Sequence, residues 1–457
     1  MNQCSSDRVT MVRIAIVGGG VGGLSLARAL NRLEVQNVAV FDRRPLPSRQ
    51  VDRGLGLWDD SQVNFLSLSQ LQLLKIIHPY LAFSQCCLRA LDVPIDSIGY
   101  SIPPASYRNK RGTWLSRCSQ TPENLSRVRS VSQNELLESL REGIEPSIVL
   151  GRELVGVRAG RESWELHFKT TETSASAIEE ADILVGADGI SSAVRSLIGF
   201  PGVKELTGGE YTYFSGIVNA GSGCPPFETL GPGCERALIR SRGLRFACVP
   251  LGAEKCLWFS SLPSLIAPED NCRSDGILRF LKDMHRDWHQ PIPQLLERSL
   301  ETGVDVLVEK HPVYVSPEKP YIITGNNMAA VLLGDSCHAV TPNLAQGAAV
   351  AIEDACDLAV CLKNNLEFNA DASGMDQCLR SYVDSRRERC RSHAQMTAFT
   401  EALSQMNGVL TEPMRNMMAF VPRPLNSWIF DAALDRSMGN FLHQGAAHRL
   451  RRAIAAL

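Results

Sequence analysis

A glycine-rich turn near the start of the chain constrains the fold more than any other feature. A short apolar run precedes the pattern G-x-G-x-x-G, which is formed by Gly18, Gly20 and Gly23. An amphipathic segment follows, and a second apolar run, 37–41, ends at Asp42. A strand, a tight turn, a helix and a second strand that ends in a carboxylate form a dinucleotide-binding unit. The sequence therefore predicts an α/β fold with a Rossmann-like parallel sheet.

Each glycine of this turn has a physical role. Gly18 permits the sharp turn, Gly20 lets the backbone approach a pyrophosphate, and Gly23 lets the helix lie close to the strand. The helix that follows offers unpaired N–H groups and a partial positive charge to phosphates. The candidate contacts in the turn are Gly18, Gly20, Val21, Gly22 and Gly23.

The carboxylate at the end of the second strand is the other half of the pattern. Asp42 can accept hydrogen bonds from the hydroxyls of an adenosine ribose, and Arg43 beside it is a further candidate contact. The pattern does not distinguish FAD from NAD, so the choice depends on later motifs.

A second strand and turn lie at 181–195. The apolar segment 183–185 leads into Asp188 and Gly189. Such an aspartate can hold a ribose or ribityl hydroxyl while the glycine lets the backbone approach. Asp-Gly is also a common turn, so the pair by itself fits both interpretations.

A third unit of this kind begins with strand 330–333, which ends at Gly334 and Asp335. A loop that contains His338 leads to a helix that begins at Gly347 with a run of small residues. Small residues let a planar ring come near, and a helix N-terminus favours negative charge. A reduced flavin carries such charge on its pyrimidine side.

Composition excludes several classes of function. A chain of 457 residues is too long for one core, so two or three domains are expected. The net charge of -2 favours no nucleic acid, and no apolar run approaches the ~18 residues of a membrane span. The polar start of the chain does not resemble a signal peptide. The 14 cysteines lack metal-ligand spacing, so we expect reduced thiols in a cytoplasmic protein.

Other elements are predicted from local patterns. Ser132 and Glu135 form a capping box at the start of a helix. The segment 88–107 is predicted as a short strand pair outside the first core. Short apolar runs with glycine or proline between them predict a separate antiparallel sheet. Its expected strands are 211–218, 236–239, 244–249 and 256–262.

The three motifs, in this order, resemble the single-component (group A) FAD monooxygenases, the family that includes salicylate hydroxylase and para-hydroxybenzoate hydroxylase. Zeaxanthin epoxidase shares the layout. The resemblance extends from Val12 to about Gln395. It implies a Rossmann-like FAD-binding domain, a mixed antiparallel-sheet substrate domain and a helical C-terminal region. The expected bounds are 1–87, 111–200 and 306–370 for the first, 88–110 and 201–305 for the second, and 371–457 for the third.

The resemblance implies a non-covalently bound FAD. Asp335 would hold the ribityl chain, and Pro342 with Gly347 would lie against the flavin ring. His338 is expected to be structural, near the flavin phosphates or the ring edge. The FAD contacts expected in the second and third motifs are Asp188, Gly189, Arg195, Gly334, Asp335, Pro342, Gly347, Ala348 and Ala349.

Two further matches lie outside the three motifs. Arg53 corresponds to an arginine that contacts FAD in the family. Gln133 stands where the family usually has arginine, although some members use glutamine. This departure affects only one expected contact.

The implied activity is hydroxylation or epoxidation of a small aromatic or isoprenoid-type substrate with O₂ and NADH or NADPH, through a flavin hydroperoxide. The nicotinamide cofactor would bind transiently, because no second nucleotide-binding unit is recognised. Two alternatives are a flavin-dependent oxidoreductase of reductase or halogenase type and a non-enzymatic FAD-binding protein. No catalytic residue is assigned, and the pocket candidates are Tyr211, Tyr213, Arg240 and Arg245.

Basic residues near the C-terminus have two interpretations. They lie on solvated helix faces, which is favoured, or they make weak peripheral contact with a membrane. The partners expected from the whole sequence are a small-molecule substrate and no nucleic acid, in a monomer or homodimer. The basic residues are Arg386, Arg387, Arg389, Arg391, Arg449, Arg451 and Arg452.

Overall fold

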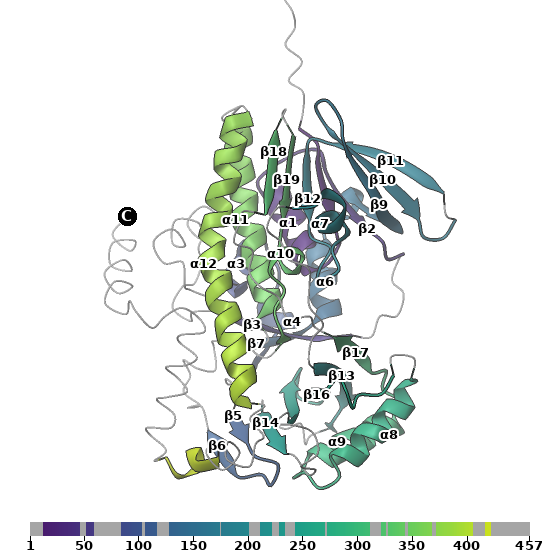
Figure 1. The fold of residues 1–457 in the computed structure, drawn as a ribbon, viewed down its shortest axis with the longest axis vertical. Helices are drawn as coiled ribbons and strands as arrows, with labels where there is room; N and C mark the ends of the chain where they lie inside the picture. Colours follow the sequence, from purple (N-terminus) through teal and green to yellow (C-terminus); the bar gives the residue numbers. More distant parts are fainter. Residues whose placement is uncertain are drawn as a thin grey trace, which may run out of the picture.

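A parallel sheet and an antiparallel sheet lie toward opposite ends of the molecule, and the long helix α12 (Ala372–Ser404) runs alongside (Figure 1). These elements come from a computed structural model. It describes residues 12–45, 52–58, 84–102, 106–116, 128–173, 175–200, 211–221, 228–233, 243–269, 272–310, 321–325, 328–342, 346–367, 372–404 and 416–421.

The first sheet is the predicted Rossmann-like core. Its strands are parallel except for β18, which pairs antiparallel with β19 at one edge. Nearly continuous apolar runs form these strands because helices or a second sheet cover both faces. From edge to edge the strands are β18 (Ile322–Gly325), β19 (Met328–Leu332), β12 (Ile183–Gly186), β1 (Ile14–Val17), β2 (Val38–Asp42) and β8 (Ile148–Leu150).

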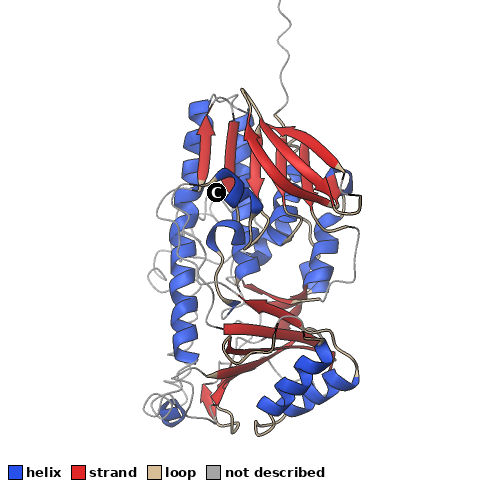
Figure 2. Cartoon of the chain, turned by 45° about the vertical axis from the view of Figure 1, so that its right-hand side comes forward, coloured by secondary structure: helices blue, strands red, loops and turns tan. Residues whose placement is uncertain are grey.

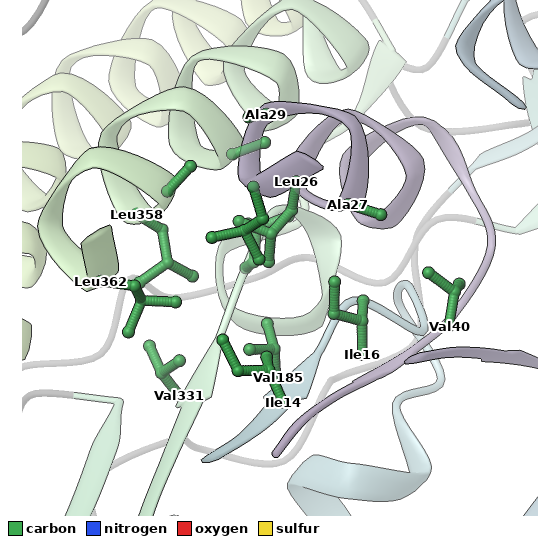
Figure 3. Packing of buried hydrophobic residues seen from close by; sticks show 14 of the residues in the cluster. Ile14, Ile16, Leu26, Ala27, Ala29, Val40, Val185, Val331, Leu358 and Leu362 are labelled. Carbon is green, nitrogen blue, oxygen red and sulfur yellow. The ribbon is translucent and has the colours of Figure 1, made fainter. Parts of the chain in front are cut away.

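Two helices cover one face of this sheet. Residues of α1 (Val21–Arg32) and α11 (Gly347–Glu367) interdigitate with the strands, as Figure 3 shows for Leu26, Leu358 and Val185. A three-stranded antiparallel sheet packs on the first sheet from another side (Figure 2). Its Trp164 Nε1 donates to the Ala329 carbonyl at 2.8 Å. Its strands are β9 (Arg152–Ala159), β10 (Trp164–Thr170) and β11 (Ser176–Ala181).

The seven-stranded second sheet confirms the predicted separate, mainly antiparallel layer; β5 and β14 pair in parallel. Helices α8 (Ser274–Met284) and α9 (Ile292–Glu301) cover its outer face, where Trp258 lies in an apolar cluster. The predicted strand 236–239 lies outside the described residues. In order the strands are β17 (Leu307–Lys310), β13 (Tyr211–Asn219), β16 (Lys255–Pro263), β15 (Leu244–Pro250), β14 (Glu228–Gly233), β5 (Ser106–Arg108) and β6 (Trp114–Ser116).

A third small sheet lies between the two large ones and corrects one prediction. The segment 88–107 forms no strand pair, because β4 joins this small sheet while β5 joins the seven-stranded sheet. Strand partners are chosen over long sequence distances, so local pattern could not reveal them. The small sheet contains β3 (Gly54–Trp58), β7 (Val128–Ser132) and β4 (Tyr100–Ile102).

Short helices connect these layers. The predicted N-cap is confirmed, since Ser132 Oγ accepts the Glu135 N–H at the start of α6 at 3.3 Å. None of the described helices combines the length and apolarity that a membrane span requires. The remaining helices are α3 (Ser84–Ala90), α4 (Ile95–Ile98), α6 (Gln133–Arg141), α7 (Ala193–Ile198), α10 (Asp335–His338) and the 3₁₀ turns Glu145–Ser147 and Met417–Phe420.

The expectation of reduced cysteines is wrong for one pair. Cys361 on α11 and Cys378 on α12 form a disulfide, with their Cα atoms 5.9 Å apart. The spacing of the two cysteines in the sequence carried no signal, because the packing of α12 on α11 brings them together. Cys337 and Cys390 are reduced and buried.

A buried arginine on α1 ties this helix to its neighbours. Replacing Arg28 by leucine is expected to lower the free energy of unfolding by about 3 kcal/mol, because several buried carbonyl groups lose a charged donor. Arg32→Leu on the same helix is the control: its ion pair with Asp92 is exposed, and a loss under about 1 kcal/mol is expected. Urea unfolding measures both, and equal losses would contradict the assignment. The acceptors of Arg28 are the carbonyl oxygens of Leu91, Asp92, Ser139 and Glu142.

Candidate functional site

The first two motifs meet where neighbouring parallel strands end. In the register of the sheet, Val17 lies opposite Gly186 and Phe41. The Gly18 N–H donates to the Phe41 carbonyl at 2.8 Å, and the Ala187 N–H donates to the Val17 carbonyl at 2.8 Å. The carboxyl ends of parallel strands are where α/β proteins bind ligands.

The three glycines of the first turn have different surroundings. Gly18 has φ +112°, and a Cβ there would overlap the Ala187 carbonyl oxygen. A Cβ on Gly23 would overlap the Gly18 carbonyl oxygen. A Cβ on Gly20 would meet no atom within 4 Å. The chain therefore requires glycine at Gly18 and Gly23 for its own packing, whereas Gly20 borders open space.

The third motif joins the same edge through Gly186. The Leu333 N–H and the Ser336 hydroxyl both donate to the Gly186 carbonyl, at 2.9 and 2.6 Å. Arg195 Nη1 donates to the Ser336 carbonyl at 2.7 Å, so this predicted cofactor contact links the second and third motifs. The three turns that the sequence singled out therefore converge on one edge of the sheet.

The Gly334–Asp335 turn lies against the start of α11. Gly334 has φ +61°, and a Cβ there would lie 3.1 Å from the Ala351 Cβ. The exposed Asp335 places its Oδ1 3.9 Å from the position of a Cβ on Gly347. Around these residues Val21, Gly22, Pro342 and Ala348 are half-buried, and Ala349 is buried.

Asp188 uses one carboxylate oxygen within the protein. Its Oδ2 accepts the N–H groups of Ala193 and Val194 at the start of α7, at 2.7 and 3.1 Å. Its Oδ1 is buried and accepts no hydrogen bond from the part of the chain that the structure describes. Burial raises the pKa of the Asp188 carboxyl. The unused oxygen beside the half-buried Gly189 is suited to a ligand hydroxyl.

Asp42 is already hydrogen-bonded by its own chain. Its Oδ2 accepts the Gly19 N–H at 2.8 Å, and its Oδ1 accepts Arg44 Nε at 2.8 Å. Burial alone would raise the pKa of Asp42, but the Arg44 guanidinium lowers it. The sequence analysis missed Arg44 and named Arg43, which is exposed. A basic residue two positions after the acid was the available signal.

Arg53 lies at the junction with the seven-stranded sheet. Its carbonyl accepts the Gln133 N–H at 2.7 Å, and its guanidinium forms an ion pair with Glu309 of β17 at 2.6 Å. Asp52, which the sequence analysis did not name, accepts the Ser132 hydroxyl at 2.6 Å and thereby fixes the chain next to Arg53. A predicted cofactor contact thus touches the seven-stranded sheet.

A row of polar residues crosses the seven-stranded sheet from this junction. We call it the polar row; it consists of Glu309, Tyr213, Ser261 and Arg245, which are opposite one another on β17, β13, β16 and β15. Directly paired residues share one face of a sheet. Tyr213, Ser261 and Arg245 are buried, and the Ser261 hydroxyl has no partner among the described residues.

The polar row lies on the face opposite to the one that α8 and α9 cover. Leu257 lies on the same face as the polar row. A Cβ on Gly54 of β3 would lie 2.5 Å from the Leu257 Cδ2. This face is therefore turned toward the small sheet of β3, β7 and β4. Of the predicted pocket residues, Tyr213 and Arg245 come together, Tyr211 is buried on β13, and Arg240 lies outside the described residues.

A buried ion cluster links α11 to α12. Arg386 Nε donates to Asp354 Oδ1 at 2.5 Å and Arg386 Nη2 donates to Glu353 Oε2 at 3.0 Å, while its Nη1 lies 3.3 Å from Asp357 Oδ2. Arg389 Nε donates to Glu353 Oε2 at 3.4 Å. All five side chains are buried. Both interpretations of Arg386 and Arg389, as solvated or as membrane-facing, are therefore wrong.

The wrong interpretation has a physical reason. Arg386 and Arg389 are three residues apart and share the face of α12 that meets the carboxylates of α11. Arg387, on another face, is half-buried and pairs with Asp384 at 3.4 Å, and Arg391 is exposed. The remaining basic run, 449–452, lies outside the described residues.

Asp354 connects this cluster to the Gly334–Asp335 turn. Its Oδ2 accepts the Gly334 N–H at 3.1 Å and lies 2.5 Å from His338 Nε2. Burial lowers the pKa of His338, but the Asp354 carboxylate, 2.5 Å away, stabilises the imidazolium, and the net effect raises this pKa well above the usual range. Burial alone would raise the pKa of Asp354, but His338 and Arg386 hold it well below the usual range. His338 is thus an imidazolium at neutral pH.

The charges in this region balance. The three carboxylates of the cluster face two guanidinium groups and the His338 imidazolium. His393, also buried, has its pKa lowered to about 3 by burial and by the charges of Arg389 and His338, so it stays neutral. His338, Asp354 and Cys390 have a spacing compatible with a metal ion, but Arg386 and His338 already occupy both oxygens of Asp354. The arrangement is therefore an ion-pair network.

Known proteins resemble this chain in sequence and in fold. A family described as "FAD binding domain" matches residues 11–255 and 327–397. Aurachin C monooxygenase/isomerase of Stigmatella aurantiaca is 27% identical over 368 residues, which cover 79% of this chain and 83% of that protein. 6-Hydroxynicotinate 3-monooxygenase of Pseudomonas fluorescens is 26% identical over 375 residues, which cover 77% of this chain and 82% of that protein.

Solved structures agree on the fold. HpxO of Klebsiella pneumoniae, in complex with FAD and uric acid, matches with a TM-score of 0.69 at 20% identity and covers 93% of this chain and 97% of its own. A salicylate hydroxylase substrate complex matches with a TM-score of 0.62 at 16% identity, over 95% and 99% of the two chains. The resemblance stated from the three motifs is confirmed. The chain belongs to the FAD-binding family of group A flavin monooxygenases.

Proposed function

We propose that this enzyme uses NADH or NADPH and O₂ to hydroxylate or epoxidise a small substrate of aromatic or isoprenoid type. The observation that carries the proposal is the convergence of three turns on one sheet edge. The polar row supports it, because Arg53 pairs with Glu309 at the end of that row. Relatives named for aurachin C, 6-hydroxynicotinate and urate support the aromatic class. Zeaxanthin epoxidase of rice, 27% identical over 82% of this chain and 52% of its own length, keeps epoxidation open.

The residues at this edge fit FAD. The open space beside Gly20 would accept the pyrophosphate, and the unused Asp188 Oδ1 would accept a hydroxyl of the cofactor. The exposed Asp335 would accept ribityl hydroxyls. Gly347 and Ala349, small residues at the start of α11, would lie against the ring and direct their N–H groups to its pyrimidine side.

Bound FAD would accept electrons from the nicotinamide cofactor and supply the chemistry that activates oxygen. The chain would bind and orient the substrate and exclude water. On the polar row, the Tyr213 and Ser261 hydroxyls would hold an oxygen or nitrogen atom of an aromatic ring, and Arg245 would stabilise negative charge that develops there. The apolar residues Leu257 and Phe259 on the same face would contact the ring.

The test is a screen of ring-hydroxy and ring-nitrogen aromatic compounds and of isoprenoid alkenes. Each is incubated with the FAD-loaded protein and NADH or NADPH, and oxygenated product is quantified by mass spectrometry beside cofactor and oxygen consumption. A product with one added oxygen atom, formed in proportion to cofactor oxidised, is expected. Stoichiometric dehydrogenation or halogenation without oxygen insertion would overturn the proposal, as would a bound flavin that no nicotinamide cofactor reduces.

Replacing Asp335 by alanine is expected to weaken FAD binding by at least about tenfold, because a buried ligand hydroxyl loses a charged acceptor. Fluorescence titration of the apoprotein with FAD measures the affinity. Asp384→Ala, which removes an exposed aspartate on α12, is the control and should bind FAD like the wild type. Equal FAD affinity in the Asp335 variant and the wild type would contradict the site.

A further inference from the structure

The backbone of the Gly334–Asp335 turn is hydrogen-bonded to the side chain of Asp354, which has no role in the proposed cofactor site. We propose that Asp354 is a positioning residue for this turn and that Arg386, on α12, controls it through the second oxygen of the Asp354 carboxylate. The inference rests on the proposed role of Asp335 in holding FAD. It assigns a cofactor-binding function to α12, a helix that supplies no residue of the three motifs.

The contacts form a continuous chain from α12 to the turn. Arg386 Nε donates to Asp354 Oδ1 at 2.5 Å, and Asp354 Oδ2 accepts the Gly334 N–H at 3.1 Å. His338 Nε2 donates to the same Oδ2 at 2.5 Å and so fixes the far end of α10. Asp335 lies between two residues that Asp354 binds, so the position of its carboxylate depends on Asp354.

The backbone of the turn makes this support necessary. Gly334 has φ +61°, and its N–H points to Asp354, while its Cα lies close to Ala351 of α11. The Ser336 hydroxyl binds the Gly186 carbonyl on the other side. The turn is therefore held between β12 and Asp354, and a shift of Asp354 would move Asp335 relative to Gly347.

Arg386 is suited to control the position of Asp354, because it forms an ion pair with this carboxylate from a different helix. Asp354 and Arg386 are both buried, so a carboxylate that lost Arg386 would take up a proton or move toward another donor. Among the described residues, the charged partners of the pair are Glu353, Asp357, Arg389 and His338. The other titratable groups that face the pair are the buried side chains of His393, Cys337, Cys390, Tyr321 and Tyr382. No other described cation donates a hydrogen bond to Asp354 Oδ1.

The test compares Asp354→Asn, Arg386→Gln and Arg386→Lys with two controls on α12. Arg389→Gln removes a buried arginine of the same cluster that binds Glu353, and Arg380→Gln removes an exposed arginine that pairs with Asp376. FAD affinity is titrated on each apoprotein, thermal unfolding is followed on the same samples, and the visible circular dichroism of bound flavin reports its orientation.

We expect Asp354→Asn and Arg386→Gln to weaken FAD binding by at least about tenfold and to change the flavin circular dichroism. Arg386→Lys keeps a positive charge and should restore most of the affinity. Arg389→Gln should lower the melting temperature without changing FAD affinity, and Arg380→Gln should change neither. If Arg386→Gln does not fold, the FAD affinities of Arg386→Lys and Asp354→Asn test the proposal instead.

Two results would overturn the inference. One is wild-type FAD affinity and circular dichroism in folded Asp354→Asn or Arg386→Gln. The other is an equal loss of FAD affinity in Arg389→Gln, which would show a general effect of the cluster on stability. Failure of the proposed function is a different result: Asp335→Ala would then bind FAD as the wild type does, whatever the α12 variants do.

Discussion

Replacing Gly23 by alanine is expected to lower the free energy of unfolding by about 3 kcal/mol or more. Alanine in a helix is normally more stable than glycine by about 1 kcal/mol, so helix propensity alone predicts the opposite sign. At Gly23 a Cβ would overlap the Gly18 carbonyl oxygen and contact the Ala187 side chain at 3.4 Å. Because both neighbours belong to the cofactor-binding turns, neither can move without distorting them. Urea unfolding of the apoprotein measures the change.

Gly20→Val is the matched comparison in the same turn. A Cβ at Gly20 meets no atom of the described chain within 4 Å, so the apoprotein should lose less than about 1 kcal/mol, mainly through weaker capping of α1. FAD binding should fall at least about tenfold, because the side chain fills the space proposed for the pyrophosphate. A variant that unfolds like the wild type but no longer binds FAD would separate the two roles of glycine. Unchanged FAD affinity would place the phosphates elsewhere.

The stability of the wild type relative to His338→Gln is expected to fall steeply as the pH rises above about 6.5. The pKa of His338 is higher in the folded state than in the unfolded chain, where it is about 6.5. Its stabilising contribution is therefore complete below pH 6.5 and is lost as the pH rises through the folded pKa. The loss is about 1.4 kcal/mol per pH unit.

Asp354 acts in the acidic range. Its pKa is lowered on folding, so its stabilising contribution is complete above about pH 3.9 and is lost as the pH falls further.

Urea unfolding of both proteins between pH 5 and pH 10 tests this expectation. Other groups that titrate in this range, such as Cys337 with its pKa raised to about 11, are present in both proteins and largely cancel in the difference. The difference between wild type and His338→Gln should be largest near pH 6 and should shrink toward alkaline pH. A constant difference across the range would mean that His338 is neutral in the folded protein.

The fold and the convergence of the three motifs could be predicted from sequence because both depend on short patterns. Continuous apolar runs, a glycine turn and a terminal acid define parallel strands and their ends, and the ends of such strands meet at one edge. Gly18, Asp188 and Asp335 lie far apart in the chain, yet each follows a strand of the same sheet. The N-cap at Ser132 is equally local, and it is confirmed.

Features that depend on packing between distant elements could not be predicted in this way. Arg386 and Arg389 look like surface residues in a basic run, and only the position of α11 reveals the carboxylates that bury them. Cys361 and Cys378 lack any recognisable spacing but become neighbours when α12 folds back on α11. The polar row requires the register of four strands, so Ser261 was not named although its neighbours Tyr213 and Arg245 were.

The pairing of Asp42 with Arg44 has a consequence for how tightly fragments of the cofactor bind. Because both oxygens of Asp42 already accept hydrogen bonds from Gly19 and Arg44, an arriving adenosine would exchange existing hydrogen bonds for new ones, with little net gain. Adenosine, which lacks the pyrophosphate, should then be a poor competitor of the intact dinucleotide. Discrimination between the whole cofactor and its adenosine fragment would come from the turns at Gly20, Asp188 and Asp335.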